Sequence, residues 1–295
     1  MNWLNGFEGR AERGVPLAGL TWFGLGGRAR YVVHPTGAES LGEVLRQALE
    51  SRVPVKILGG GANVLVRDNG FDGVVVRLDD ASFRRVEIDG DRVRAGAGAD
   101  LMKLAQRCSR AGLAGWECLA GIPGTVGGAI RMNAGGRNGD VSETVEAIEV
   151  LAWDSPAVDR RIVAKQQVGF GYRRTGLGGS VVTAATFRLR QEDPGRVYAR
   201  FQEVLRCKQA SQPTADHSAG CIFANPQGDS AGRLIDRAGL KNTRRGGARV
   251  STQHANFIVA DRGATADDVL NLIDVIRETV HKRFGTELRL EIDIW

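Results

Sequence analysis

The chain has 295 residues, of which 42% are hydrophobic and 25% charged, and its net charge is +6 at pH 7. These fractions exclude a disordered or fibrous chain, and the length predicts about two domains. No uncharged apolar run approaches the length of a membrane span, and the mixed, charged N-terminus is not a signal peptide. The four cysteines show no metal-ligand spacing with the four histidines. We therefore expect a cytoplasmic protein without a metal and without a membrane partner.

The basic residues are scattered, and the densest cluster is only Thr243–Arg249, reading TRRGGAR. A nucleic-acid interface would more often show a basic stripe with interleaved aromatic side chains. The charge thus favours a small anionic ligand over nucleic acid. We interpret the cluster as a solvated turn, with contact to an anion as the alternative.

Residues 1–57 are predicted to form a small α/β lobe. Helical spacing of apolar residues predicts a helix over Thr36–Leu49, with Thr36 or Ser40 as its cap. Gly24–Ala29 matches the GxGxxA dinucleotide-binding pattern, which requires a following helix. The residues that follow, Arg28–Pro35, instead alternate and end in proline, which predicts a strand. We therefore expect a glycine-rich turn that enters a strand, and not a Rossmann unit.

The middle and end of the chain predict an α+β protein. One helix, Asp100–Ala111 with Gly112 after it, interrupts a region of strands. Helical spacing returns over residues 195–210 and Ser230–Ala238, and the clearest helix follows the capping-box pair Thr265 and Asp268. The predicted strands are Gly73–Leu78, Phe83–Ile88, Arg92–Ala95, Thr144–Trp153, Arg160–Val163, Ser180–Leu189, Asn256–Ala260 and Glu287–Trp295.

Two glycine-rich stretches, Leu58–Asn63 and Gly121–Gly135, are the strongest functional signal. Glycine lets a backbone approach a ligand closely, and consecutive free N–H groups form a cradle for anionic oxygen. Two such cradles suggest an extended pyrophosphate, such as that of a dinucleotide. Either stretch alone could equally be an ordinary tight turn.

Three further positions could carry chemistry. Gly169–Arg174 places paired arginines in a short connection, where they could bind a carboxylate or form a solvated basic turn. Cys221, directly after a glycine, could be a proton donor or nucleophile, or a small buried hydrophobe. Glu291, between Leu290 and Ile292, could face outward or enter an active site. We treat His254 as structural.

The order of these motifs resembles the UDP-N-acetylenolpyruvoylglucosamine reductase family, flavoenzymes that complete UDP-N-acetylmuramate in bacterial peptidoglycan synthesis. The resemblance extends from about Thr21 to Ile292, and the short Tyr172–Ser180 connection looks like the family's shorter second type. Its carriers are Thr21–Gly27, Leu58–Asn63, Gly121–Gly135, Gly171–Arg173, Ala219–Pro226, Ala238–Lys241, His254–Val259 and Phe284–Leu288 leading to Glu291.

The resemblance implies a three-lobed α+β FAD-binding fold. It consists of an N-terminal lobe (1–57) completed by a C-terminal strand (286–295), a central FAD-binding domain of the FAD-linked oxidase type (58–195) and a substrate-binding α+β domain (196–285). It also implies a monomer that uses FAD and NADPH. In the mechanism that the resemblance implies, NADPH reduces FAD at N5, hydride passes to the methylene carbon of UDP-N-acetylglucosamine enolpyruvate, and C2 is then protonated.

The resemblance implies roles for individual residues as well. Arg173 and Glu291 would stabilise the intermediate, Cys221 would donate the proton, and Tyr172 and Asn225 would contact the nucleotide-sugar substrate. The implied FAD contacts are Gly59, Gly60, Gly61, Ala62, Asn63, Gly121, Ile122, Pro123, Gly124, Thr125, Gly127, Gly128, Ala129, Asn133, Ala134 and Gly135.

Two positions depart from the family pattern. Many members have Ser where this chain has Cys221, and a thiol is the stronger acid, but a thiolate beside Arg173 could not donate a proton. Ala224 stands where the family commonly has Lys before Asn-Pro. Two rival hypotheses remain: another FAD-linked oxidase or dehydrogenase of the same fold, and a non-catalytic basic nucleotide- or RNA-binding protein.

Overall fold

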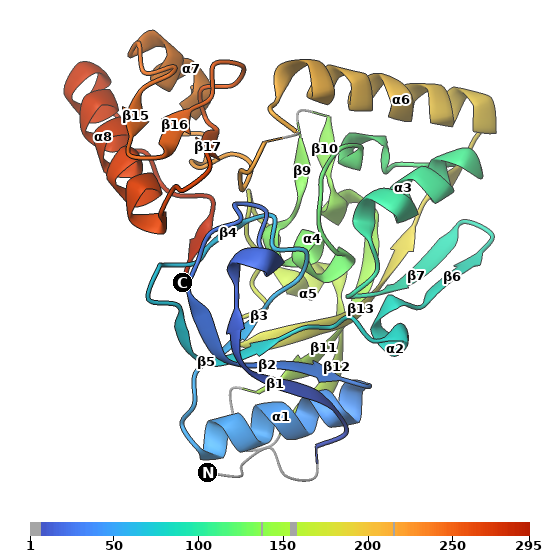
Figure 1. Ribbon diagram of the computed structural model, residues 1–295. Coiled ribbons are helices and arrows are strands. Elements are labelled where there is room, and N and C mark those ends of the chain that lie inside the picture. The colour runs from blue at the N-terminus through green and yellow to red at the C-terminus, as the bar shows by residue number, and fades with distance from the viewer. Residues whose placement is uncertain (1–6, 137, 154–157, 215) are drawn as a thin grey trace. The chain divides into compact units, whose positions relative to one another are not determined.

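The computed structural model describes residues 7–136, 138–153, 158–214 and 216–295 (Figure 1). The chain packs into two compact units. Unit 1 contains the described residues of 1–13 together with 30–59 and 73–207, and unit 2 contains 14–29, 60–72 and 208–295. The three-lobe division expected from the resemblance stays a prediction.

Unit 1 is built on a five-stranded antiparallel sheet in the order β12 (Asp159–Ala164), β11 (Val145–Ala152), β13 (Ser180–Arg188), β7 (Arg92–Gly96) and β6 (Val86–Asp89). Strands β7, β11, β12 and β13 lie where strands were predicted, so those four predictions are confirmed. Trp116 packs edge-on against Phe187 of β13 with ring centroids 4.7 Å apart, and both side chains are fully buried. Such an aromatic pair stabilises the folded state beyond the apolar area that it buries. Its burial shows which side of the sheet faces the core.

A second sheet has the order β1 (Gly9–Pro16), β2 (Arg28–Pro35), β5 (Phe71–Val76) and β3 (Val55–Ile57). Helix α1 (Ala38–Glu50) lies along it and buries Leu41, Val44 and Leu45, as its spacing predicts (Figure 1). The predicted cap is wrong. Gly37 is the N-cap residue, because the hydroxyls of Thr36 and Ser40 both donate to the carbonyl of Glu8 instead.

Two predictions in unit 1 need correction. Phe83–Ile88 is not one strand: a short helix, α2 (Ala81–Arg84), precedes β6, and the Asp80 carboxylate accepts the Ser82 N–H at its start. The prediction of one helix, Asp100–Ala111, among the strands of this region is also wrong. The region contains two more helices, α4 (Val126–Met132) and α5 (Lys165–Val168). Helix α4 escapes sequence analysis because its two glycines disfavour a helix, but Gly127 packs so close to Ala97 that an added Cβ would lie 2.8 Å from the Ala97 Cβ.

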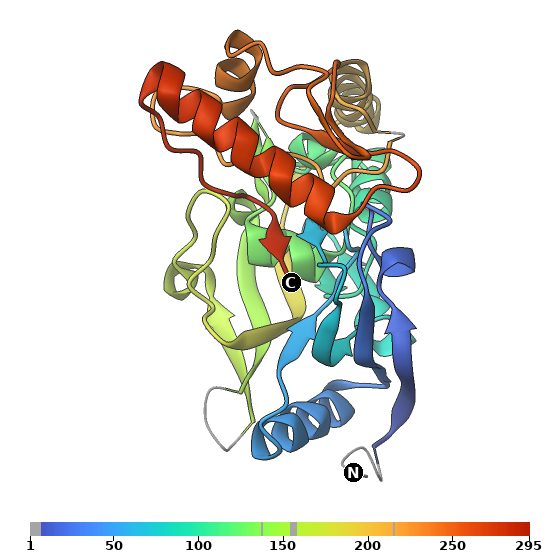
Figure 2. The same ribbon diagram turned by 60° about the vertical axis from the view of Figure 1, so that its left-hand side comes forward.

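Unit 2 has its own core between helices and a small sheet. Helix α8 (Ala266–Phe284) contacts α7 (Ala231–Arg237) and the sheet β15 (Arg244–Arg245), β16 (Ala248–Val250), β17 (Ile258–Ala260) (Figure 2). The capping box at Thr265 and Asp268 is confirmed, with the Thr265 hydroxyl accepting the Asp268 N–H at 3.1 Å. Helical spacing predicts one apolar face of α8, and four of its residues, Val269, Ile273, Ile276 and Val280, are buried, while the fifth, Phe284, is partly buried.

The terminal strand is shorter than predicted. Only β18 (Asp293–Ile294) is a strand, parallel to β4 (Val64–Leu65). Residues 289–291 instead pair with residues 222–224, through Ala224 N–H to Arg289 O at 2.9 Å and Glu291 N–H to Ile222 O at 2.8 Å. The Thr243–Arg249 cluster forms the β15–β16 hairpin, in which Arg244 and Arg249 both bind the Asp261 carboxylate.

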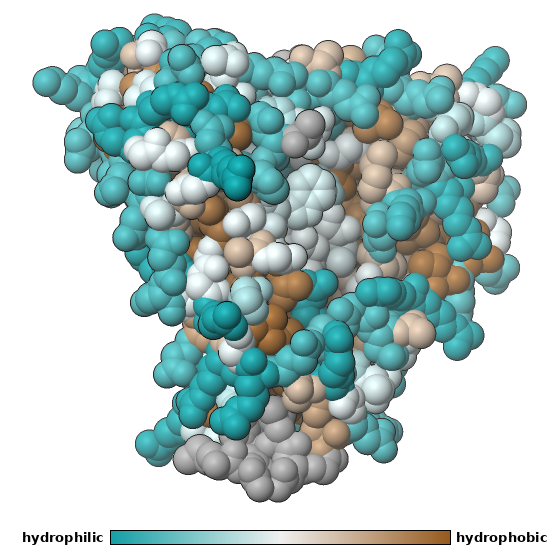
Figure 3. Space-filling view, viewed as in Figure 1, coloured by the Kyte–Doolittle hydropathy of each residue, from teal (hydrophilic) through white to brown (hydrophobic). Residues whose placement is uncertain are grey.

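The remaining elements lie between those already described along the chain. They are η1 (Ala18–Leu20), α3 (Leu101–Arg110), β8 (Leu113–Ala114), η2 (Glu117–Leu119), β9 (Gly135–Gly136), β10 (Gly139–Asp140), η3 (Val141–Glu143), β14 (Arg190–Gln191) and α6 (Pro194–Ser211). Four of them form two small two-stranded sheets, β10-β9 and β14-β8. Among the described residues, every helix is too short or too polar to cross a membrane. Hydrophilic side chains form most of the outer edge of the face in Figure 3.

Candidate active site

The first glycine-rich stretch leaves a row of backbone donors unused. Leu58 N–H still binds Val76 O at 2.9 Å, as part of the sheet edge. After it, the described residues provide no hydrogen-bond acceptor for the N–H groups of Gly59 through Asn63. Gly61 is itself buried, and a buried N–H without a partner is rare in a finished fold. The loop therefore has the donor set that an anionic ligand such as a diphosphate would satisfy.

Close packing explains why this loop needs glycine at position 61. Gly61 has φ +68°, in the left-handed region. A Cβ there would overlap the carbonyl oxygen of Leu20 and lie 2.9 Å from the Thr21 Cα. Trp22 N–H binds Gly61 O at 2.9 Å and fixes this contact. The Thr21–Gly27 motif thus forms a glycine-rich turn that supports the loop, and not a Rossmann turn.

The second stretch joins a turn to the start of α4. Gly124 has φ +120° with open space where a Cβ would stand, and Thr125 caps the helix by accepting the Gly128 N–H at 3.3 Å. Val126 and Gly127 donate to the carbonyls of Ala99 and Ala97, so these two N–H groups serve the fold. The two stretches meet within unit 1, where a Cβ on Gly59 would lie 2.7 Å from the Thr125 hydroxyl oxygen.

Arg173 lies at the tip of a tight turn. Gly171 and Arg174 exchange backbone hydrogen bonds at 3.0 and 3.2 Å, and Arg173 between them has φ +55°. A left-handed arginine costs about 1–3 kcal/mol, so the surrounding structure must hold it there. Its guanidinium donates to the carbonyl oxygens of Asn133 (3.3 Å) and Gly135 (2.8 Å). The predicted catalytic cation is therefore tied to the predicted FAD-binding stretch.

Inside unit 2, the segments that carry Cys221 and Glu291 pair with each other, and Asn63, the last residue of the first glycine-rich loop, is bonded to the Glu291 segment. Cys221 is half-buried and forms a β-bridge with Phe257, and the next residue, Ile222, accepts the Glu291 N–H. The Asn63 side chain donates to Glu291 O at 3.1 Å. Backbone pairing thus links the segments of the predicted proton donor and the predicted carboxylate, and the Asn63 side chain ties the end of the first glycine-rich loop to the same segment.

The two predicted substrate contacts differ in their surroundings. The Tyr172 ring is 49% exposed and lies 4.9 Å from the Arg173 guanidinium carbon, in cation–π geometry. Asn225 is exposed, but its side-chain oxygen accepts the Ala231 N–H at 3.0 Å at the start of α7. Contact of either residue with substrate stays a prediction. Arg173 belongs to unit 1 while Cys221 and Glu291 belong to unit 2, so their convergence also stays a prediction.

His254, predicted to be structural, is packed edge-on against Phe257 with ring centroids 4.8 Å apart. Its Nδ1 accepts the Asn256 N–H at 3.3 Å, which assigns the proton of the neutral ring to Nε2. Burial, and secondarily the charge of Lys241, lowers the pKa of His254. The ring is therefore neutral in the folded protein at pH 7.

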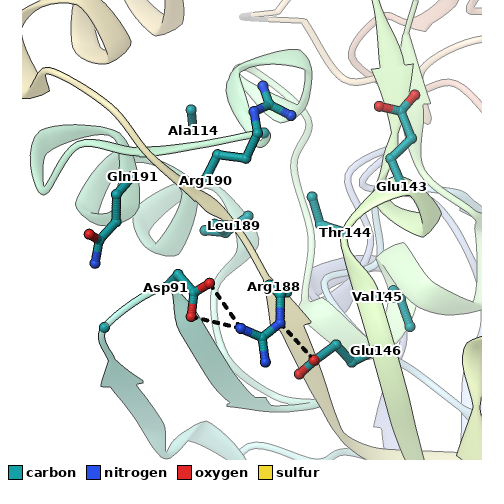
Figure 4. Close-up of a pocket in the computed structure, with 12 residues that line it drawn as sticks. Asp91, Ala114, Glu143, Thr144, Val145, Glu146, Arg188, Leu189, Arg190 and Gln191 are labelled. Carbon is teal, nitrogen blue, oxygen red and sulfur yellow. Dashed lines mark hydrogen bonds and ion pairs between the residues drawn. The ribbon is translucent and has the colours of Figure 1, made fainter.

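A separate cleft of about 710 Å³ lies on unit 1, between β13, η3 and the β6–β7 turn (Figure 4). Arg188 spans it, binding Asp91 at 2.9 Å through Nη1 and Glu146 at 2.9 Å through Nε. This ion-pair network joins Asp91, Glu146 and Arg188 to one another, and none of the predicted site residues lines the cleft. Among the described residues, no cluster of His, Cys, Asp or Glu could hold a metal ion.

Comparison with known proteins agrees with this geometry. Residues 29–159 match the model of the FAD binding domain, and residues 212–295 match the C-terminal domain of UDP-N-acetylenolpyruvoylglucosamine reductase. Both glycine-rich stretches lie within the matched FAD binding domain, and the first one offers N–H groups for which the described residues provide no acceptor, which fits FAD.

Full-length relatives cover almost the whole chain. UDP-N-acetylenolpyruvoylglucosamine reductase 2 of Symbiobacterium thermophilum is 43% identical over 97% of this chain and 92% of its own length. The reductase of Myxococcus xanthus is 42% identical over 98% and 93%. The crystal structure of the Thermus caldophilus reductase superposes with a TM-score of 0.84 at 38% identity, covering 97% of this chain and 99% of that one. The chain therefore belongs to the UDP-N-acetylenolpyruvoylglucosamine reductase family.

Proposed function

We propose that this protein reduces UDP-N-acetylglucosamine enolpyruvate to UDP-N-acetylmuramate, with NADPH as the reductant and FAD as the resident cofactor. The relatives that bear the reductase name cover nearly the whole chain, so both the flavin-binding and the C-terminal parts are present. The observation that carries the proposal is the N–H row of Gly59–Asn63, for which the described part of the chain provides no acceptor and whose last residue binds the segment that bears Glu291.

The glycine-rich residues would hold the diphosphate of FAD. Gly59, Gly60, Gly61, Ala62 and Asn63 offer consecutive N–H groups, and the Gly121–Gly135 stretch faces Gly59 through Thr125. A cradle of consecutive backbone N–H groups binds an anion through the partial positive charge on each amide hydrogen. When bound, FAD supplies the hydride transfer, from NADPH and onward to the enolpyruvyl methylene carbon.

Arg173 and Glu291 are proposed to stabilise the negative charge that develops on the substrate carboxylate. The Arg173 guanidinium is fixed in advance by two carbonyl oxygens, so little reorganisation is needed when the charge appears. A carboxyl group can assist an enolate only by donating a hydrogen bond, since an ionised carboxylate is acceptor-only. Glu291 is therefore proposed to carry a proton in this step.

Cys221 is proposed to hold the proton that C2 receives. A thiol can donate it, whereas a thiolate cannot, so the half-buried sulfur must stay protonated until hydride has arrived. Tyr172 and Asn225 are proposed to contact the nucleotide sugar. Ala224 offers no cation for the substrate diphosphate where the family commonly has lysine. We further propose that the protein acts as a monomer in the cytoplasm.

Anaerobic titration of the purified, flavin-loaded protein tests the function directly. NADPH is expected to bleach the flavin, and the enolpyruvyl sugar nucleotide is then expected to restore the oxidised spectrum in stoichiometric amount. Restoration by oxygen but not by the enolpyruvyl compound would favour another FAD-linked oxidase. A colourless protein that takes up no flavin would favour the nucleotide-binding rival.

A further inference from the structure

The buried Asn133 side chain joins three parts of unit 1. It is only 2% exposed and caps the C-terminus of α4 in the left-handed conformation, with φ +43°. Its Nδ2 donates to the Asp140 carboxylate at 3.1 Å and to the Gly171 carbonyl oxygen at 3.1 Å. Its Oδ1 accepts the Ser142 N–H at 3.3 Å.

The chemistry of these partners determines the orientation of the Asn133 side-chain amide, that is, which terminal atom is nitrogen and which is oxygen. Nδ2 faces two acceptors and Oδ1 faces a donor, so a flipped amide would place oxygen against a carboxylate and a carbonyl. Both amide N–H groups are consequently used inside the protein. A contact of this side chain with FAD would have to be made by Oδ1 alone.

Two of the bonds made by Asn133 converge on Arg173. The side chain holds Gly171, the first residue of the turn that places Arg173 at φ +55°. The main chain of the same residue accepts Arg173 Nη1 at 3.3 Å, beside the 2.8 Å bond from Nη2 to Gly135 O. One buried residue thus fixes both the backbone that carries Arg173 and the direction of its guanidinium.

We infer that Asn133 is a positioning residue for Arg173, and that its amide serves the substrate half of the reaction and not the binding of FAD. This inference rests on the proposed role of Arg173. A displacement of about 1 Å in a group that stabilises charge costs about 10²-fold in rate, so loss of the amide should act on the step that uses Arg173.

Asn133→Gly is the test variant, because glycine adopts φ +43° freely and keeps the main-chain carbonyl while removing the amide. The main chain of residue 133, which could still make the FAD contact implied by the resemblance, is kept, so we expect unchanged FAD content and unchanged flavin reduction by NADPH. Reoxidation of the reduced flavin by the enolpyruvyl sugar nucleotide should slow about 10- to 100-fold. Arg52→Gly, which replaces another left-handed residue in the exposed turn after α1, is the matched control and should leave both half-reactions unchanged.

A double-variant cycle separates positioning from general damage. In an Arg173→Ala background, Asn133→Gly should slow reoxidation no further, because the group that it positions is already gone. Additive losses, equal slowing of flavin reduction, or loss of FAD would overturn the inference. If Asn133→Gly does not fold, Asn133→Ser takes its place, because serine retains one hydrogen-bond donor. It should again slow flavin reoxidation and leave flavin reduction unchanged. Equal slowing of both half-reactions would refute the inference. Wild-type protein that never reoxidises with the enolpyruvyl compound would refute the proposed function itself.

Discussion

Replacing Gly61 by alanine should displace the glycine-rich loop Leu58–Asn63 and weaken FAD binding. The added Cβ would overlap the Leu20 carbonyl oxygen and press on the Thr21 Cα at 2.9 Å. Both obstacles are backbone atoms, and the Trp22 N–H to Gly61 O bond holds the two segments together. The loop must therefore shift as a whole, which displaces the N–H row.

Gly14 provides a matched comparison. Its φ is +61°, close to the +68° of Gly61, but a Cβ there would meet nothing within 4 Å. Gly14→Ala should thus cost only the left-handed backbone penalty, about 1 kcal/mol in the free energy of unfolding. Gly61→Ala adds an overpacking term of about 1–3 kcal/mol, for a total of about 2–4 kcal/mol.

Urea unfolding of both variants, measured without and with saturating FAD, checks the magnitude. Gly61→Ala should also bind FAD more weakly, whereas Gly14→Ala should bind it like wild type. Equal destabilisation by the two substitutions would refute the steric argument. Normal FAD affinity in Gly61→Ala would show that the loop does not hold the cofactor.

Three further predictions concern single side chains. Cys221→Ala should leave flavin reduction by NADPH intact and suppress flavin reoxidation by the enolpyruvyl substrate. Cys221→Ser should retain substantial activity, because a hydroxyl can also donate a proton. Stopped-flow traces in which Cys221→Ala slows both half-reactions equally would contradict this. Because the pKa of His254 is lowered on folding, the unfolded chain binds the proton first, and stability should fall as pH drops from about 6.5 toward the folded pKa. An NMR titration that places the His254 pKa above 6.5 would disprove it. Asp268→Ala removes the acceptor for two backbone N–H groups and should cost about 1–2 kcal/mol in urea unfolding, against less than about 0.5 kcal/mol for the exposed Asp267→Ala.

Local patterns were sufficient where one interaction dominated. The apolar face of α8 and its capping box depend on spacing within a few residues, and both are confirmed. The strand over Arg28–Pro35 is confirmed too, and it ruled out the Rossmann hypothesis from the sequence alone. The motif order identified the family, because so many short signals rarely occur together by chance.

Patterns failed where a distant partner decided the outcome. The hydroxyls of Thr36 and Ser40 are good caps, but the Glu8 carbonyl competes for them. The glycines of α4 argue against a helix until Ala97 is packed against Gly127. The last residues alternate like a strand, yet residues 289–291 bond to the segment after Cys221.

The sequence by itself determined the class of fold, the two glycine-rich loops and the candidates Arg173, Cys221 and Glu291, because these depend on residue type and short-range order. Only the tertiary structure decided which N–H groups of Gly59–Asn63 find no acceptor among the described residues, and which residue holds Arg173 in place. Hydrogen bonds between residues some forty positions apart, such as Asn133 to Gly171, leave no periodic trace in a single sequence. Their geometry exists only after the chain has packed.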